Sequence, residues 1–311
     1  MSNLRLFPLT TIALTLFSAQ LPEELPCPYA KQFALKLAGR SESGMSHVEI
    51  GVDGRRCAAV GHTLLAEDFF ESGRLADAVR HLSAAIRLAE AEPANARLLF
   101  GALRIQVTVL VEGGMLSEAR ALIQRLRTVS FDLPEQNAVV QGLAGACYQA
   151  AGDHRAAERE YLQAIRAWDS IQRSKDSVTE RSNLGVLYIA LRRFEDAIEL
   201  LQHALALLPS GKRTAYHRLV ITNNLAVACR EQGQTDLAVR YAREAVRLVE
   251  GARLGRFNQV AGVYSNSAQI LRTAGHKREA KELELKARRV AAMAEAVVDF
   301  SELRDGGNTK P

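Results

Sequence analysis

A short block recurs six times along the chain and restricts the folds open to it. Five copies open with glycine, all six close with alanine, and successive copies start 41, 38, 40, 41 and 42 residues apart. A chain that repeats one unit at such a period folds as a stack of that unit, and not as the two separate domains that 311 residues would suggest. The copies are GRLADA at 73–78, GMLSEA at 114–119, GDHRAA at 152–157, RRFEDA at 192–197, GQTDLA at 233–238 and GHKREA at 275–280.

Each block lies between two amphipathic runs that lack the alternation typical of strands. We therefore predict that each repeat is a helix, a tight turn and a second helix. The opening glycine suits the left-handed residue that ends a helix, because it has no Cβ to clash there, and Arg192 is the one departure. The predicted fold is all-α: an α-solenoid of about six stacked helix-turn-helix repeats in one right-handed superhelix.

Residue size alternates along the repeats in a way that suits close contact between helices. The alanine that closes each block recurs seven residues later in five repeats, and Leu126 replaces it in the second repeat. In the first helices a small residue stands between two larger ones, as in Leu184, Gly185 and Tyr188. The small residues are predicted to lie where the two helices of a repeat approach each other.

This arrangement resembles the tetratricopeptide repeat, whose signature combines a Leu-Gly or Leu-Ala pair, an aromatic residue, a turn glycine and two later alanines. The fourth repeat matches it best, through Leu184, Gly185, Tyr188, Ala197, Ala204 and Pro209. The usual period is about 34 residues; the longer period here is similar to the kinesin-light-chain type, as is the segment NNLAVACREQGQTDLAVRYAREAVRL from Asn223. The resemblance covers roughly residues 57–295 and implies a module that binds other proteins, without naming a partner.

The first 19 residues are typical of a secretory signal peptide. They combine Arg5 with an apolar run from Leu6 to Ala19, before a turn rich in Pro and Glu. This run has 14 residues, fewer than the roughly 20 needed to span a bilayer, so we expect no membrane span in the mature chain. The predicted location is exported, in a periplasm. The alternative is a cytoplasmic protein with a disordered or docked N-terminus.

The other predicted divisions are a linker over 20–56, the solenoid over 57–296 and a flexible tail over 297–311. Cys27 and Cys57 bracket the linker, and in an oxidising compartment they could close a loop. Two unpaired thiols are the alternative. The strongly charged run before the tail is predicted to cap the stack with a polar face.

Charge does not indicate a nucleic-acid partner. The chain has 40 Lys and Arg residues against 35 Asp and Glu, a net charge of +5 and an isoelectric point near 9.1. We read this excess as mild and spread over the whole length.

The motifs of catalysis and metal binding do not appear in the sequence. PSGKRT at 209–214 lacks the first glycine and the preceding strand of a phosphate loop. The seven histidines show no ligand spacing, and Cys147 and Cys229 fall at apolar packing positions, where buried, unreactive thiols are expected. We therefore predict no enzyme and no cofactor. An accessory subunit of an enzyme or envelope complex is an alternative.

One polar pattern goes beyond architecture. Asn183, Asn224 and Asn266 occupy the same place in three successive first helices, although asparagine is a poor helix former. A carboxamide can both donate to and accept from a peptide bond, so these residues are predicted to hold an extended chain in a concave groove. The full predicted peptide-binding set is Ser182, Asn183, Asn223, Asn224, Arg230, Ser265, Asn266, Gln269 and Arg272.

Two other interpretations of the asparagines remain open. They could bridge adjacent helices without any ligand, or the groove could be filled by the protein's own N-terminal segment in a self-associating structural protein. Repeats one to three carry Leu64, Ile105 and Leu143 at this position, so a polar groove is expected only in the C-terminal half. The partner is predicted to be a protein or peptide of unknown identity.

Overall fold

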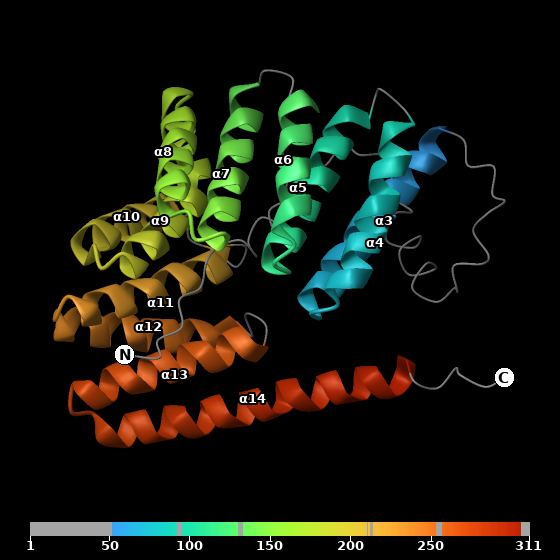
Figure 1. Ribbon diagram of the computed structural model, residues 1–311. Helices are drawn as coiled ribbons and strands as arrows, with labels where there is room; N and C mark the ends of the chain where they lie inside the picture. Colours follow the sequence, from blue (N-terminus) through green and yellow to red (C-terminus); the bar gives the residue numbers. More distant parts are fainter. Residues whose placement is uncertain are drawn as a thin grey trace. The chain divides into compact units, whose positions relative to one another are not determined.

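The protein is described by a computed structural model, which places residues 52–91, 95–129, 133–209, 211, 214–252 and 257–305. Within these ranges the chain is helical and contains no strand (Figure 1). The elements in chain order are α3 (Val52–Glu71), α4 (Leu75–Glu90), α5 (Ala96–Glu112), α6 (Leu116–Val129), α7 (Pro134–Ala150), α8 (His154–Ser170), the 3-10 helix η4 (Ser174–Ser177), α9 (Val178–Ala190), α10 (Phe194–Leu207), α11 (Ala215–Glu231), α12 (Thr235–Ala252), α13 (Phe257–Thr273) and α14 (Lys277–Asp305).

The chain divides into two compact units, with the boundary between Glu180 and Arg181. In the N-terminal unit α3 packs on α4, α5 on α6 and α7 on α8, and each pair also contacts the next. In the C-terminal unit α11 packs on α12 and α13 on α14, and α10 and α12 each contact the first helix of the following pair. The predicted order of helix pairs is thus confirmed. Its right-handed sense stays a prediction.

The predicted turns end the first helices as expected. The five block glycines have positive φ, from 73° to 88°, and Arg192 takes the same conformation with a φ of 62°. At Gly152 the amide bonds to the carbonyl of Gln149 and the next amide to that of Tyr148, the pattern of a Schellman cap. The same two bonds form at Arg192, so the hydrogen bonding of this turn survives without glycine.

Small residues lie at the predicted helix contacts. The six alanines that close the blocks are completely buried, each at 0% exposure. A Cβ added to Gly145 would lie 2.7 Å from the Tyr161 ring, and one added to Gly185 would lie 2.7 Å from Leu201. Glycine therefore lets α8 and α10 approach the first helices of their repeats.

The described helices extend past two predicted boundaries. Helix α3 begins at Val52, inside the expected linker, and α14 continues to Asp305, inside the expected tail. The signal peptide, most of the linker and Cys27 lie outside the described residues. Over the part that is described, no helix is both long and apolar enough to cross a membrane.

Candidate interaction surface on the first helices

The predicted peptide-binding residues lie on α9, α11 and α13, the first helices of the C-terminal unit. The structure divides them by burial. Arg230 and Gln269 are half-buried, and Ser265 and Arg272 are exposed. The others are buried to 3% exposure or less: Ser182, Asn183, Asn223, Asn224 and Asn266.

Two of the asparagines join neighbouring helices. Asn266 on α13 donates from Nδ2 to Oδ1 of Asn223 on α11 at 3.1 Å, and Asn223 donates to Asn224 at 3.4 Å. The sequence hypothesis placed these side chains in an open groove, whereas the structure buries them, because α11 and α13 pack directly on each other. This geometry favours the bridging interpretation. Contact between the asparagines and a ligand stays a prediction.

The two arginines of the set are held by carboxylates. Arg230 pairs with Glu231 at 2.5 Å. Arg272 pairs with Glu284, which links α13 to α14. The arginines are thus positioned at one end of the first helices, close to the turns that follow them.

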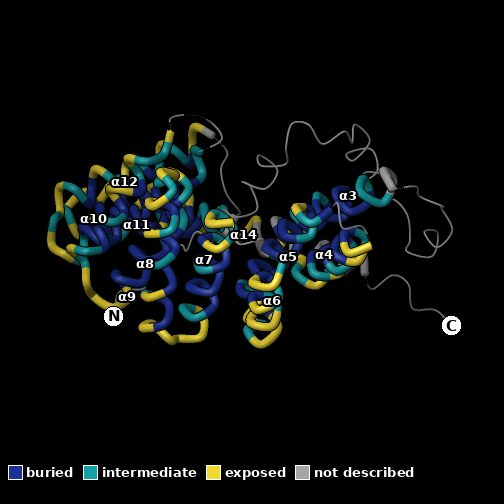
Figure 2. Tube along the Cα trace, turned by 90° about the horizontal axis from the view of Figure 1, so that it is seen from above, coloured by how far each residue is buried: buried dark blue, intermediate teal, exposed yellow. Residues whose placement is uncertain are grey.

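Three buried polar side chains of this region have no hydrogen-bond partner in the described residues. They are Ser182 at its Oγ, Thr222 at its Oγ1 and His217 at both ring nitrogens. Burial lowers the pKa of His217 to about 4, so the imidazole is neutral near pH 7. Because most buried polar groups in native proteins are bonded, these unpaired groups set the first helices of this unit apart from an ordinary apolar core. Figure 2 shows α11 buried over most of its length, whereas α6 has exposed residues along one side.

Sequence reasoning missed a charged cluster in the N-terminal unit. Arg104 stands ten residues before its turn glycine, the register of Ser182 and Asn223, and is only 8% exposed. Burial lowers the pKa of Arg104 to about 10, and the charges of Glu67 and Glu180 oppose that shift. Buried polar residues of first helices thus also occur in the N-terminal unit, in the register next to that of the asparagines. The available signal was an arginine inside the apolar run ALRIQV.

Gly142 occupies the same register and makes room for this cluster. A Cβ at this position would lie 2.5 Å from Oε1 of Glu180. Glu180 is itself 7% exposed, so α7 and the start of α9 enclose a carboxylate. Gly142 and Gly145 both lie at close helix contacts, since a Cβ at either position would meet a neighbouring side chain at 2.7 Å or less.

The described residues contain no group of side chains that could hold a metal ion. Cys147 and Cys229 are free and buried, as expected, and burial raises the pKa of Cys229 to about 11. Burial also raises the pKa of Cys147, so both thiols are protonated near neutral pH, which disfavours nucleophilic chemistry.

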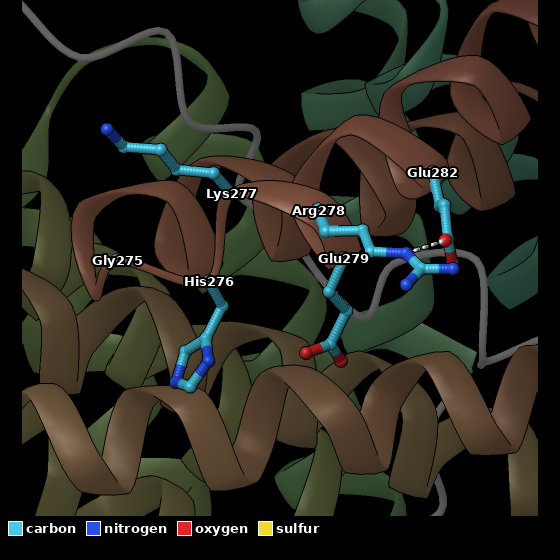
Figure 3. A pocket seen from close by; sticks show the side chains of 6 residues that line it. All are labelled: Gly275, His276, Lys277, Arg278, Glu279 and Glu282. Atoms are coloured by element: carbon cyan, nitrogen blue, oxygen red, sulfur yellow. Dashed lines mark ion pairs between the residues drawn. The ribbon is translucent and has the colours of Figure 1, made fainter.

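A shallow pocket of about 510 Å³ lies at the turn between α13 and α14 (Figure 3). Its carboxylates are paired, since Glu282 meets Arg278 at 3.5 Å and Glu279 meets Arg243 of α12 at 2.8 Å. The pocket is lined by Gly275, His276, Lys277, Arg278, Glu279 and Glu282.

The repeated helix pairs, Schellman turns and small contact residues define an α-solenoid over the described residues. Residues 136–210 and 176–251 match the tetratricopeptide repeat family, so the segment 136–251 consists of tetratricopeptide repeats. The helix pairs on either side repeat the same turn and packing.

Solved structures agree with this assignment. BtubC (BKLC) from P. vanneervenii is 18% identical, with a TM-score of 0.58 over 78% of this chain and 94% of that chain. The apo form of RapI is 12% identical, with a TM-score of 0.55 over 91% of this chain and 99% of that chain. A Rap protein complexed with Competence and Sporulation Factor is 14% identical, with a TM-score of 0.57 over 86% of this chain and 72% of that chain. At these identities the likeness shows the fold alone. No curated protein matches the sequence.

Proposed function

We propose that the chain is a non-catalytic scaffold that binds an extended segment of a partner protein along α9, α11 and α13. The observation that carries the proposal is the group of exposed or half-buried polar side chains on α11 and α13: Arg230, Ser265, Gln269 and Arg272. These side chains have no role in apolar packing, and their amide, hydroxyl and guanidinium groups can bond to the main chain of an extended peptide.

The exposed members of the predicted set provide the contacts. Ser265, Gln269 and Arg272 follow one another at helical spacing on α13 and are exposed or half-buried, and Arg230 lies at the end of α11. The buried asparagines beneath them hold the helices in register. In this proposal the exposed residues contact the ligand, and the buried asparagines hold the helices in position. The known complex of a Rap protein with Competence and Sporulation Factor offers a precedent for ligand binding by this fold.

The test is selection of peptides from a random displayed library with the full chain. The variant combines Gln269→Ala with Arg272→Ala, and the matched control combines Glu199→Ala with Arg240→Ala, exposed residues of α10 and α12. We expect the selected peptides to bind the control like the native chain and to lose about tenfold in affinity or more with the variant. Equal affinity for variant and control contradicts the assigned surface.

The self-filled alternative is tested in the same assay. A chain that starts at residue 52 lacks the segment that would occupy the surface. If that segment competes with peptides, the shortened chain binds them more tightly than the full chain does. Equal affinities contradict an internal ligand.

A further inference from the structure

The first helix of the first repeat, α3, has a buried side that its described neighbours do not explain. In the N-terminal unit α3 packs on α4 and contacts α5, and it is the first helix that the structure describes (Figure 1). The apolar core that α3 shares with these helices includes Ala59, Val60, Ala66 and Phe70. Among the described residues Leu65 does not belong to this core, yet it is only 5% exposed.

Later repeats show what covers the position of Leu65, eight residues before the turn glycine. Gln106 has this position in α5 and donates to Oγ of Ser83 in α4 at 3.1 Å. Ser267 has it in α13 and donates to the carbonyl of Ala242 in α12 at 3.3 Å. In both cases the partner is the second helix of the preceding repeat. Leu65 therefore lies on the side of α3 that a preceding second helix would cover.

The buried side continues toward the start of α3. Ala58 and Gly61 stand seven and four residues before Leu65, so the three share one side of the helix, and both are buried, Ala58 at 1% exposure. Asp68 and Ser72, on the same side nearer to the turn, are exposed. These exposures are those of a single chain, so the chain itself covers the strip from Ala58 to Leu65, which we call the buried strip.

A disulfide identifies the part of the chain that reaches this strip. Cys57 directly precedes the strip and is disulfide-bonded. The sequence has four cysteines, and Cys147 and Cys229 are free. This leaves Cys27 as the partner of Cys57 within the chain, so the bond tethers the segment around Cys27 to the start of α3.

The sequence between these two cysteines contains a run suited to cover the buried strip. In residues 29–38, Phe33, Leu37 and the alanine after each fall on one half of a helix. Gln32 and Lys36 fall on the other half, where Leu35 is the one apolar exception. Ten helical residues extend over about 15 Å, whereas the buried strip extends over about 12 Å. The run is therefore long enough to cover it.

We propose that residues 27–38 dock on the buried strip of α3 and cap the N-terminal end of the solenoid. Phe33 and Leu37 take the place that the second helix of a preceding repeat has in later repeats, and the bond between Cys27 and Cys57 holds them there. Such a cap closes the apolar end of the stack, because each repeat is built to be covered by a neighbour. The proposal concerns the N-terminal unit and does not depend on peptide binding by α11 and α13.

Reaction of an introduced cysteine with a maleimide tests the cover in the full chain, without a reducing agent. Leu65→Cys is the reporter. Leu225→Cys is its matched control, since Leu225 has the same position in α11, is 0% exposed and has the preceding second helix, α10, against its own helix. We expect both thiols to react slowly. The double change Phe33→Ser and Leu37→Ser should accelerate the reaction at position 65 about tenfold or more and leave that at position 225 unchanged.

The control in the segment is Gln32→Ser with Lys36→Ser, which should not change the reaction at position 65. Fast reaction at position 65 in the otherwise native chain overturns the proposal, as does a rate there that Phe33→Ser and Leu37→Ser do not change. Equal acceleration at positions 65 and 225, or by both pairs of serine changes, also overturns it. Peptide mapping without reduction should find Cys27 joined to Cys57, and any other partner of Cys57 contradicts the tether.

Discussion

At the scale of single residues, the turn of the fourth repeat has a strained backbone at Arg192. Arg192 holds a left-handed backbone where the other repeats have glycine, and its guanidinium lies 5.6 Å from the Phe194 ring. A non-glycine residue in this region costs about 1 kcal/mol or more. The fourth repeat, which otherwise matches the family signature best, therefore has the least favourable turn residue.

Replacement of this arginine tests that cost. We expect Arg192→Gly to raise the free energy of unfolding by about 1 kcal/mol, reduced by the greater freedom of glycine in the unfolded chain. Gly152→Ala is the reverse change at a φ of 78° and should lower stability by a similar amount. Urea denaturation measures both. A loss of stability in Arg192→Gly would contradict strain at this turn.

Close helix contact predicts a larger effect at Gly185. Gly185→Leu places a side chain against Leu201, where even a Cβ comes to 2.7 Å, and we expect a loss of about 1–3 kcal/mol. Ala197→Leu, at 0% exposure, should cost a similar amount. Thermal melts provide the measurement, with exposed Glu199→Leu on the same helix as control. An unchanged midpoint in Gly185→Leu would place this residue away from the contact.

The two interpretations of the asparagines predict different effects of their replacement on stability. Asn266→Ala removes the donor to Asn223 and leaves a buried oxygen without that bond, so we expect a loss of about 1–3 kcal/mol. The triple change of Asn183, Asn224 and Asn266 to Ala should lower the melting temperature by several degrees or more. If the asparagines are instead exposed and hold a ligand, the triple change should leave the melting temperature unchanged or raise it, because alanine is the better helix former. An unchanged or higher midpoint, with lost peptide binding, would restore the groove hypothesis.

At the scale of elements, buried histidines connect helix packing to pH. His62 on α3 and His81 on α4 share a hydrogen bond between their Nδ1 atoms at 2.8 Å, so one ring donates and the other accepts. The pKa of His62 is lowered to about 4, first by burial and then by the charges of His81 and Arg87. Burial lowers that of His217 in α11 to the same value. Each unit thus contains one histidine that folding keeps neutral.

This arrangement predicts acid sensitivity with a defined sign. In the unfolded chain both histidines ionise near pH 6.5, so between about pH 6.5 and 4 the unfolded chain binds more protons than the folded one. Stability from this source is complete above about pH 6.5 and falls as the pH drops toward about 4. Urea denaturation over this range measures the slope. The double variant His62→Gln and His217→Gln should flatten it, and an equal slope would contradict the assignment.

At the scale of the whole molecule, export stays a prediction that protein chemistry can test directly. The signal-peptide pattern places the mature N-terminus near Gln20. N-terminal sequencing of the protein from the envelope fraction of its native cell should begin there. An intact Met1 on protein recovered in the cytoplasm would contradict export.

The sequence by itself determined the repeat architecture. Turn residues such as Gly152 and contact residues such as Gly185 and Ala197 were predictable, because helix periodicity, left-handed turns and close packing depend on neighbours a few residues away. Six copies of one local pattern also leave few alternatives to stacking.

Only the tertiary structure decided how the polar residues are used. Asn266 on α13 bonds to Asn223 on α11, and Arg104 lies near the charges of Glu67 and Glu180. These interactions join residues that are 37 to 76 positions apart in the sequence. Whether a polar side chain is buried depends on which other helix packs over it. The residue pattern of a single helix does not contain that information. The same holds for α14, where Glu279 and Lys286 pair with Arg243 and Glu250 of α12.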